Sequence, residues 1–230
     1  EQKNQIVSNV PDYFERIYTH CVDGRDSVEL AKAFKEWCPH YYLKNFQQGE
    51  WGIWFSTLNA WSAAALNEEP LIIFEDDALV GHDFRLKFNQ YIRDIPDDTD
   101  FISLWTPKDQ KIDYRYDVTY DEIGQAKIHG INQGRSLFEF GHEYLARVYQ
   151  GYGGVAIMLT DQGANKLLSL AREEGLWSTS DCFYYLQAHR GKLNGYALKP
   201  EYNLIDYNEQ TPTQIHNKEV VNVDIFRSLK

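Results

Sequence analysis

The sequence predicts an α/β protein whose sheet is mostly parallel. Three short apolar runs, at residues 71–74, 101–105 and 153–159, have the composition of strands that are buried on both faces. Stretches with the apolar spacing of helices lie between and after them, most clearly at residues 49–67 and 160–174. Strands that alternate with helices in this way favour a twisted, mostly parallel sheet flanked by helices in a single domain.

Composition narrows the class of protein further. The 230 residues are enough for one well-cored domain, and the net charge of −11 disfavours a nucleic-acid binder, which needs a basic face. No apolar run approaches the ~20 residues that a membrane span needs. Cys21, Cys38 and Cys182 have no paired short spacing. We therefore expect free thiols, a cytoplasmic location and no integral membrane segment.

The first part of the chain is predicted to contain three helices and a strand. Residues 2–10 have the pattern of a short helix, and residues 16–21 alternate like a strand. Asp26, with Glu29 three positions later, resembles a capping box that opens a helix running to about Trp37. The next helix is rich in tryptophan and ends at a Glu-Glu-Pro sequence before the first buried strand.

The rest of the chain continues the alternation, apart from two regions. Residues 108–150 are polar and rich in tyrosine, and we expect an irregular insertion that contains hairpins or a substrate loop. Residues 211–230 form a mostly polar C-terminal tail, and the whole chain, 1–230, is expected to be one domain. The other expected elements are helices at residues 82–95 and 180–189 and strands at residues 196–198 and 203–205.

Three consecutive carboxylates follow the first buried strand: Glu75, Asp76 and Asp77. In open α/β sheets, ligands bind beyond the carboxyl ends of the strands. Adjacent carboxylates repel one another unless a cation or N–H groups neutralise them, and oxygen ligands of this kind suit Mn²⁺ or Mg²⁺ together with phosphate. The alternative is a solvated acidic turn that caps the next helix.

Further motifs accompany these carboxylates in a fixed order over residues 15–206. In chain order they are Asp23-Gly24-Arg25; Gly49, Glu50, Gly52, Ser56 and Trp61; Glu75-Asp76-Asp77; residues 151–167, with Gly163-Ala164; Asp181; and Pro200. This series resembles glycosyltransferase family 25, which includes lipooligosaccharide and procollagen galactosyltransferases. Each motif is weak alone, and their order and spacing together are fairly specific.

Two features depart from the family pattern. The family helix usually carries Ser-His, whereas here Ser56 is followed by Thr57. The family normally begins with a strand of the type V-I-N-L, and the predicted helix at residues 2–10 leaves no place for it. One hypothesis is that residues 220–226 supply this strand from the other end of the chain. The alternatives are a truncated chain and a plain C-terminal extension.

The resemblance implies a GT-A-like fold and a metal-dependent, inverting glycosyltransferase. The enzyme would move a hexose, galactose or glucose, from a nucleotide sugar, expected to be UDP-linked, to an acceptor hydroxyl, with Mn²⁺ or Mg²⁺ as cofactor. The acceptor would be a glycan, a lipooligosaccharide or another hydroxylated molecule, with residues 108–150 on the acceptor side, and the charge disfavours nucleic acid. The alternatives are a catalytically degenerate sugar-nucleotide or glycan binding module and a metal-dependent phosphohydrolase.

The resemblance also implies roles for the acidic residues. Glu75 and Asp77 read as a DXD-like pair that binds the metal, with His216 as a further ligand, and Glu75 or Asp76 would hold sugar or ribose hydroxyls. Asp181 would be the general base that takes the proton of the acceptor hydroxyl. For Asp181, sugar binding and plain helix capping are the alternatives.

Glycines and aromatic residues complete the expected nucleotide-sugar site. Asp23, Gly24 and Arg25 would lie by the base or ribose, or would simply form a tight turn. Gly153 and Gly154 would allow a ligand to approach the backbone closely, or would only shape the entry to a strand. Two residues near strand and loop ends, Trp105 and Trp177, are candidates for stacking on a sugar or a base.

Overall fold

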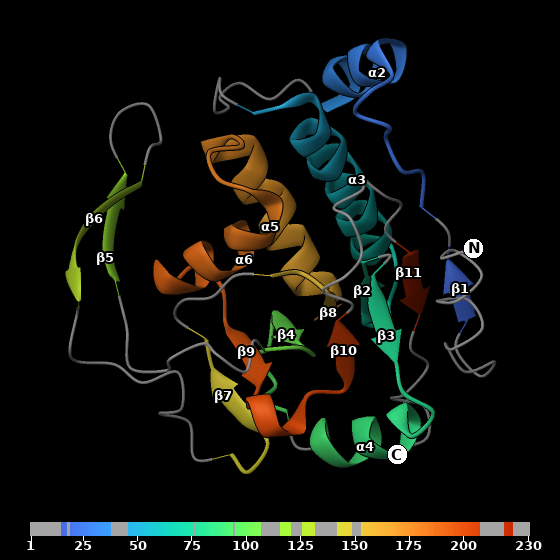
Figure 1. The fold of residues 1–230 in the computed structure, drawn as a ribbon, viewed down its shortest axis with the longest axis vertical. Helices are drawn as coiled ribbons and strands as arrows, with labels where there is room; N and C mark the ends of the chain where they lie inside the picture. The colour runs from blue at the N-terminus through green and yellow to red at the C-terminus, as the bar shows by residue number, and fades with distance from the viewer. Residues whose placement is uncertain are drawn as a thin grey trace.

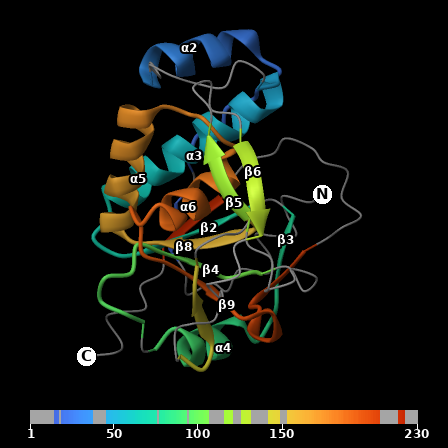
Figure 2. The same cartoon turned by 90° about the vertical axis from the view of Figure 1, so that its left-hand side faces the viewer.

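The computed structural model describes residues 15–17, 19–37, 46–75, 77–93, 95–106, 116–120, 126–131, 142–148, 153–207 and 219–222. For residues 15–17, 116–120, 126–131, 207 and 219–222, only the backbone is described. A central sheet has helices on both of its faces (Figure 1; Figure 2). The predicted α/β class, with a sheet flanked by helices, is confirmed.

The central sheet has seven strands in the order β1-β11-β2-β8-β4-β9-β7. Only β4 and β9 pair in parallel among the described strands, and the other neighbours pair antiparallel. The sheet is therefore mixed, because β8 runs in the opposite direction between β2 and β4. The strands are β1 (Glu15–Ile17), β2 (Leu71–Phe74), β4 (Phe101–Ser103), β7 (Leu145–Arg147), β8 (Ala156–Leu159), β9 (Gly195–Leu198) and β11 (Glu219–Asn222).

The helices divide between the two faces of this sheet, as Figure 2 shows. Most of them cover one face: α2 (Ser27–Trp37), α3 (Gln48–Ala65), α5 (Asp161–Glu174) and α6 (Ser180–His189). The other face carries α4 (Phe84–Tyr91), the 3-10 turn η1 (Pro200–Tyr202) and the antiparallel pair β3 (Ala78–Val80) and β10 (Ile205–Tyr207). A separate antiparallel pair, β5 (Tyr116–Tyr120) and β6 (Ala126–Ile131), lies within the region that the sequence leaves unassigned.

Two apolar clusters hold these layers together, one on each face of the sheet. On the helix-rich face, the rings of Trp54 and Trp61 in α3 pack against Phe183 in α6, with ring centroids 5.3 and 5.9 Å apart. On the other face, Phe74 of β2 packs against Phe84 of α4. Each large side chain buried in this way contributes about 1.5–3 kcal/mol of transfer free energy.

Local signals in the sequence place several helix ends correctly. Oδ1 of Asp26 accepts hydrogen bonds from the N–H groups of Val28 and Glu29, and Oγ1 of Thr160 accepts one from the N–H of Gly163. These caps open α2 and α5 where the sequence predicts them. The carboxylate of Glu29 reaches the N–H of Asp23 instead of closing the predicted box on Asp26.

Other boundaries differ from the prediction. Strand β8 begins at Ala156 and not at Gly153, because Gly153 has a φ of +88° and leaves the extended conformation. Helix α4 is shorter than the predicted 82–95 and spans Phe84–Tyr91. The helix expected at residues 2–10 lies outside the described residues.

The C-terminal strand bears on the hypothesis of a displaced first strand. Strand β11 lies inside the central sheet, between β1 and β2, where the hypothesis requires a strand. It runs antiparallel to both of these neighbours. Residues 223–226 lie outside the described residues.

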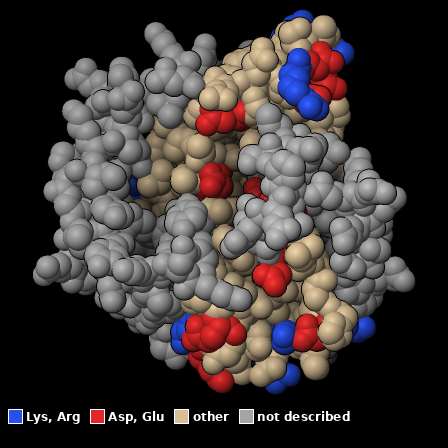
Figure 3. All heavy atoms as spheres, in the orientation of Figure 1, with Lys and Arg blue, Asp and Glu red and all other residues tan. Residues whose placement is uncertain are grey.

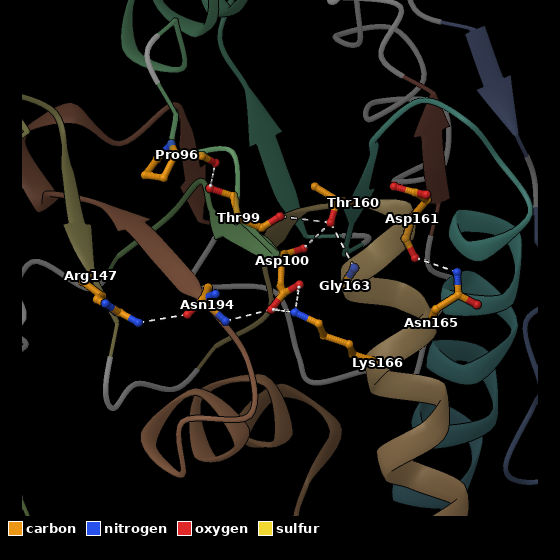
Figure 4. Close-up of polar contacts among 10 residues, drawn as sticks. All are labelled: Pro96, Thr99, Asp100, Arg147, Thr160, Asp161, Gly163, Asn165, Lys166 and Asn194. Atoms are coloured by element: carbon orange, nitrogen blue, oxygen red, sulfur yellow. Dashed lines mark hydrogen bonds and ion pairs between the residues drawn. The ribbon is translucent and has the colours of Figure 1, made fainter.

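A buried carboxylate, Asp100, lies at one end of the sheet, directly before β4 (Figure 4). Its side chain is 0% exposed and lies 2.8 and 2.9 Å from Nζ of Lys166 on α5, which approaches both oxygens. The backbone N–H of Asn194 donates to Oδ2 of Asp100 at 2.8 Å. Gly163 packs so closely that a Cβ there would lie 2.1 Å from the carbonyl oxygen of Asp100. This network fixes α5 to the sheet.

Candidate functional site

Three chain segments meet at the opposite end of the central strands. Glu75 directly follows β2, Trp105 lies two residues beyond β4, and Gly153 and Gly154 precede β8. They share one edge because β8 runs antiparallel to both β2 and β4. The N–H of Glu75 donates to the carbonyl oxygen of Val155 at 2.9 Å, so the β2–β8 ladder continues up to the first carboxylate.

Gly154 lies between two of the predicted site carboxylates, Glu75 and Asp181. A Cβ built on Gly154 would be 3.1 Å from Oε1 of Glu75 and 3.6 Å from Cβ of Asp181. The absence of a side chain at Gly154 therefore lets a strand-end carboxylate and a helix-start carboxylate approach the same backbone position. The structure brings these three predicted site residues together.

Asp181 lies in the first turn of α6, where a helix N-terminus favours negative charge. Its Oδ2 accepts a hydrogen bond from the N–H of Gly153 at 3.2 Å. The N-cap position itself belongs to Thr179. The carboxylate of Asp181 thus binds across to the turn before β8, and the interpretation as a plain helix cap is the weaker one.

The same turn is held by a second residue of α6, Tyr185. Its hydroxyl lies 3.0 Å from the carbonyl oxygen of Gly153 and 3.2 Å from Oγ of Ser103, which in turn donates to the carbonyl oxygen of Trp105 at 2.6 Å. Gly153 has a positive φ, and a Cβ there would lie 2.9 Å from the ring of Trp105. Glycine is therefore required at 153 on both conformational and steric grounds.

The buried groups beside this edge experience negative charge. Burial is the main cause that raises the pKa of Tyr184 and of Tyr185, and the charges of Asp181 and Glu75 raise both pKa values further. Burial, followed by the charge of Asp181, raises the pKa of the Cys182 thiol to about 11. All three groups stay neutral at physiological pH, so the negative charge of the edge resides on the carboxylates.

Acidic side chains are visible around the hollowed middle of the face drawn in Figure 3, whereas the visible Lys and Arg side chains lie mainly toward its top and bottom. A negative surface of this kind repels the phosphates of a nucleotide unless a cation neutralises it.

The predicted metal ligands are only partly described. Glu75 and Asp77 are both half-buried, and the N–H of Ala78 donates to the carbonyl oxygen of Glu75 at 3.1 Å. Asp76 and His216 lie outside the described residues. Among the residues that the structure describes, no group of three or more His, Cys, Asp and Glu side chains has the spacing of a metal site.

The Asp23-Gly24-Arg25 turn is accounted for by structural contacts. Both oxygens of Asp23 bind the guanidinium of Arg25 at 2.9 Å on an exposed surface. A Cβ on Gly24 would lie 2.0 Å from the carbonyl oxygen of Gln48, and one on Gly52 would lie 2.7 Å from the N of Gly24. The turn thus packs backbone to backbone against the start of α3, which favours the tight-turn interpretation; its predicted nucleotide contact stays a prediction.

The structure also describes three other positions that the sequence analysis singled out. Thr57 is 1% exposed, and its Oγ1 has no hydrogen-bond partner among the described residues. Trp177 is 6% exposed, packs against Phe183 and lies under the guanidinium of Arg190, so its ring is not available for stacking on a ligand. Trp105 is half-buried at the site edge.

The sequence prediction did not include Tyr185 or Ser103 in the site. A usable signal existed for Tyr185, because it lies four positions after Asp181, and residues at this spacing share one face of a helix. Ser103 is the last residue of the buried strand β4, and no neighbouring residue in the sequence indicates that its hydroxyl makes a hydrogen bond at the site.

α/β enzymes bind their ligands beyond the carboxyl ends of the strands, and here Glu75 follows β2 at such an end while Asp181 lies in the first turn of α6 beside it. A family model described as glycosyltransferase family 25 (LPS biosynthesis protein) matches residues 13–184, about three quarters of the chain. The chain belongs to glycosyltransferase family 25 and is a glycosyltransferase. No curated protein matches the chain. Within the described residues, none of the helices is both long and apolar enough to cross a membrane.

Proposed function

We propose that this glycosyltransferase moves a hexose from a nucleotide sugar, most simply a UDP-linked one, to a hydroxyl of a glycan or lipooligosaccharide acceptor, with inversion and with the help of a divalent cation. The observation that carries the proposal is the meeting of Glu75 and Asp181 over Gly154. Glu75 follows a strand, where a diphosphate would lie, and Asp181 lies in the first turn of a helix; Oε1 of Glu75 and Cβ of Asp181 both lie within 4 Å of the position that a Cβ on Gly154 would occupy.

In this mechanism, Asp181 is the general base. Its carboxylate takes the proton from the acceptor hydroxyl while the hydroxyl oxygen attacks the anomeric carbon and the bond to the nucleoside diphosphate breaks. A single carboxylate opposite the leaving group is what an inverting transfer needs. The hydrogen bond from the N–H of Gly153 to Oδ2 orients the carboxylate without neutralising it.

The cation would be held by Glu75 and Asp77, with Asp76 and His216 as further candidates. Carboxylate oxygens fit Mn²⁺ or Mg²⁺, and both metals commonly complete their coordination with phosphate oxygens. Such a cation supplies charge stabilisation for a leaving diphosphate. Glu75 or Asp76 would also hold a sugar or ribose hydroxyl, and the carboxylate of Glu75 lies beside the glycine turn.

Thermal unfolding with a panel of UDP-, GDP- and CMP-sugars, each with Mn²⁺ and with EDTA, tests the donor site. A ligand that binds only the folded state raises the unfolding midpoint. We expect one nucleotide class to raise it with Mn²⁺ only, and Asp77→Ala to abolish the increase. Asp83→Ala, which removes a nearby exposed carboxylate, is the matched control and should keep the increase.

Turnover then separates the transferase from a binding module. Release of the nucleoside diphosphate in the presence of a glycan acceptor, with an inverted anomeric linkage in the product, is the expected result. A metal-dependent increase in the midpoint without any sugar transfer would contradict turnover and favour the degenerate binding module, for which the change to Thr57 is the motive. No increase with any donor would contradict the nucleotide-sugar site itself.

A further inference from the structure

Helix α6 binds the backbone of Gly153 on both sides of its Cα, through its N–H and through its C=O. Asp181 accepts from the N–H of Gly153 at 3.2 Å, and the hydroxyl of Tyr185, one helical turn later, lies 3.0 Å from the carbonyl oxygen of the same residue. The two side chains share a face of the helix because they are four residues apart. Helix α6 therefore supplies a hydrogen-bond partner for both the N–H and the C=O of Gly153.

The tyrosine is itself positioned by the sheet. Tyr185 is buried, and its hydroxyl lies 3.2 Å from Oγ of Ser103, the last residue of β4, whose own proton goes to the carbonyl oxygen of Trp105. Burial raises the pKa of Tyr185, so the hydroxyl remains a neutral donor. The Trp105 ring, against which Gly153 packs, is thus tied to the same chain of contacts.

This arrangement does more than pack α6 against the sheet. The N–H and the carbonyl of Gly153 belong to the peptide groups before and after its Cα, so the two contacts together restrain the φ and ψ of this glycine. If these torsions changed, the N–H would leave Oδ2 of Asp181, and the carboxylate would lose the contact that sets its direction. The Tyr185 hydroxyl restrains them from the carbonyl side. A general base must lie within hydrogen-bond reach of its proton, and misplacement by about 1 Å can lower a rate by two orders of magnitude.

We propose that Tyr185 is a positioning residue for the transfer reaction: by holding the carbonyl of Gly153, it fixes the amide that orients the carboxylate of Asp181 toward the acceptor hydroxyl. This inference rests on the proposed function, in which Asp181 is the base. Tyr185 does not touch the reacting atoms, and it acts through Gly153.

The test compares Tyr185→Phe with Tyr184→Phe in the full chain. Both remove one buried hydroxyl from adjacent positions of α6, but the Tyr184 hydroxyl contacts Nε1 of Trp61. We expect similar decreases of the unfolding midpoint in the two variants. Only Tyr185→Phe should lower kcat, by about tenfold, with an unchanged KM for the nucleotide sugar.

A second variant covers the case in which Tyr185→Phe folds poorly. Ser103→Ala keeps the contact between Tyr185 and Gly153 but removes the second partner of the hydroxyl, and it should lower kcat by less than about threefold. Equal kcat values for Tyr185→Phe and Tyr184→Phe, in an enzyme whose wild type transfers sugar, would overturn the positioning role. A wild type that transfers nothing would instead contradict the proposed function.

Discussion

The carboxylates at the two ends of the central strands differ in their burial and in their hydrogen-bond partners. Asp100, directly before β4, is 0% exposed and receives hydrogen bonds from Lys166 on both oxygens and from the N–H of Asn194. Glu75 and Asp181, at the other end, are half-buried and lie beside one backbone position, Gly154. A buried carboxylate that is surrounded by donors maintains structure, whereas the two half-buried carboxylates beside Gly154 belong to the proposed donor and acceptor site.

The comparison predicts that activity and stability depend on different carboxylates. Asp181→Asn keeps the size of the side chain and removes its capacity to accept a proton. We expect kcat to fall by about a thousandfold, since general bases contribute 10²–10⁴-fold to rate, while the free energy of unfolding changes little. Steady-state transfer assays and urea unfolding measure the two quantities.

Asp161→Asn is the matched control for this variant. Asp161 lies in the first turn of α5, as Asp181 does in α6, and it is exposed. Its substitution should leave kcat unchanged and, because it removes a first-turn charge, should lower the free energy of unfolding by about 0.3–1 kcal/mol at most. A kcat for Asp181→Asn within threefold of the wild-type value would contradict the proposal that Asp181 is the general base.

Asp100→Ala should have the opposite effect. The change leaves the Lys166 ammonium without its partner and the N–H of Asn194 without an acceptor. Because the Lys166 side chain is 35% exposed and can partly reach water, we expect a loss of about 3 kcal/mol in the free energy of unfolding, at the lower end for broken buried pairs. Chemical denaturation gives the loss, and kcat per folded molecule should be unchanged.

The exposed pair of Asp83 with Lys87 provides the contrast. Asp83→Ala breaks an ion pair on the surface, where water and salt screen the charges, so the unfolding midpoint should hardly move. If Asp83→Ala and Asp100→Ala lowered the free energy of unfolding equally, the distinction between a surface and a buried carboxylate would not hold for this protein.

Gly154→Ala tests the functional end by sterics alone. The new Cβ would lie 3.1 Å from Oε1 of Glu75, so the carboxylate must shift by a few tenths of an ångström. We expect kcat/KM to fall by about tenfold with little loss of stability, because geometry at the reacting centre controls rate steeply.

Gly191→Ala is the control: the φ of Gly191 is +72°, and a Cβ there would meet nothing within 4 Å. It should cost about 1 kcal/mol of stability and no activity.

A carboxylate at the end of α5 gives the smallest effect, which depends on pH. Hydrogen bonds and charges from Lys192, Gln187 and Arg190 hold the pKa of Glu174 at about 2, although burial opposes the shift. Its ordinary value is 4.5, so the stabilisation is complete above about pH 4.5 and is lost as pH falls toward 2. The partners are 39–40% exposed, so we expect about 1 kcal/mol. Urea unfolding of the wild type and of Glu174→Gln at pH 7 and pH 3 should show the difference between them shrinking at the lower pH.

The sequence predicted most of the helices and the buried strands because their signals are local. Apolar residues at helical spacing, a cap at Thr160 and the four apolar residues before Glu75 each act within one element. The order of the strands is not local. That β8 would run between β2 and β4 in the opposite direction depends on long-range pairing, which no short pattern specifies.

The candidate site follows the same division. The sequence predicted four residues of the candidate site: Asp181, Glu75, Gly153 and Gly154. It could do so because the order of the motifs resembles that of a family and because residues at strand ends meet at one edge. Ser103 had no such signal, and Tyr185 had only its spacing of four residues from Asp181, because the contacts of both side chains form only when α6 lies over the end of β4. The Asp23 turn, in contrast, has the contacts of a tight turn that packs on α3.

The position of β11 has a consequence for synthesis on the ribosome. Strand β11 is the last strand of the described chain, yet it lies between β1 and β2 and pairs with both. Until it emerges, the outer edge of β2 has no partner on that side, and an unpaired edge is a template for association with other chains. Such distant pairing also slows folding. We therefore expect nascent chains that stop before residue 219 to depend on chaperones, and this region to be the last part of the sheet to close.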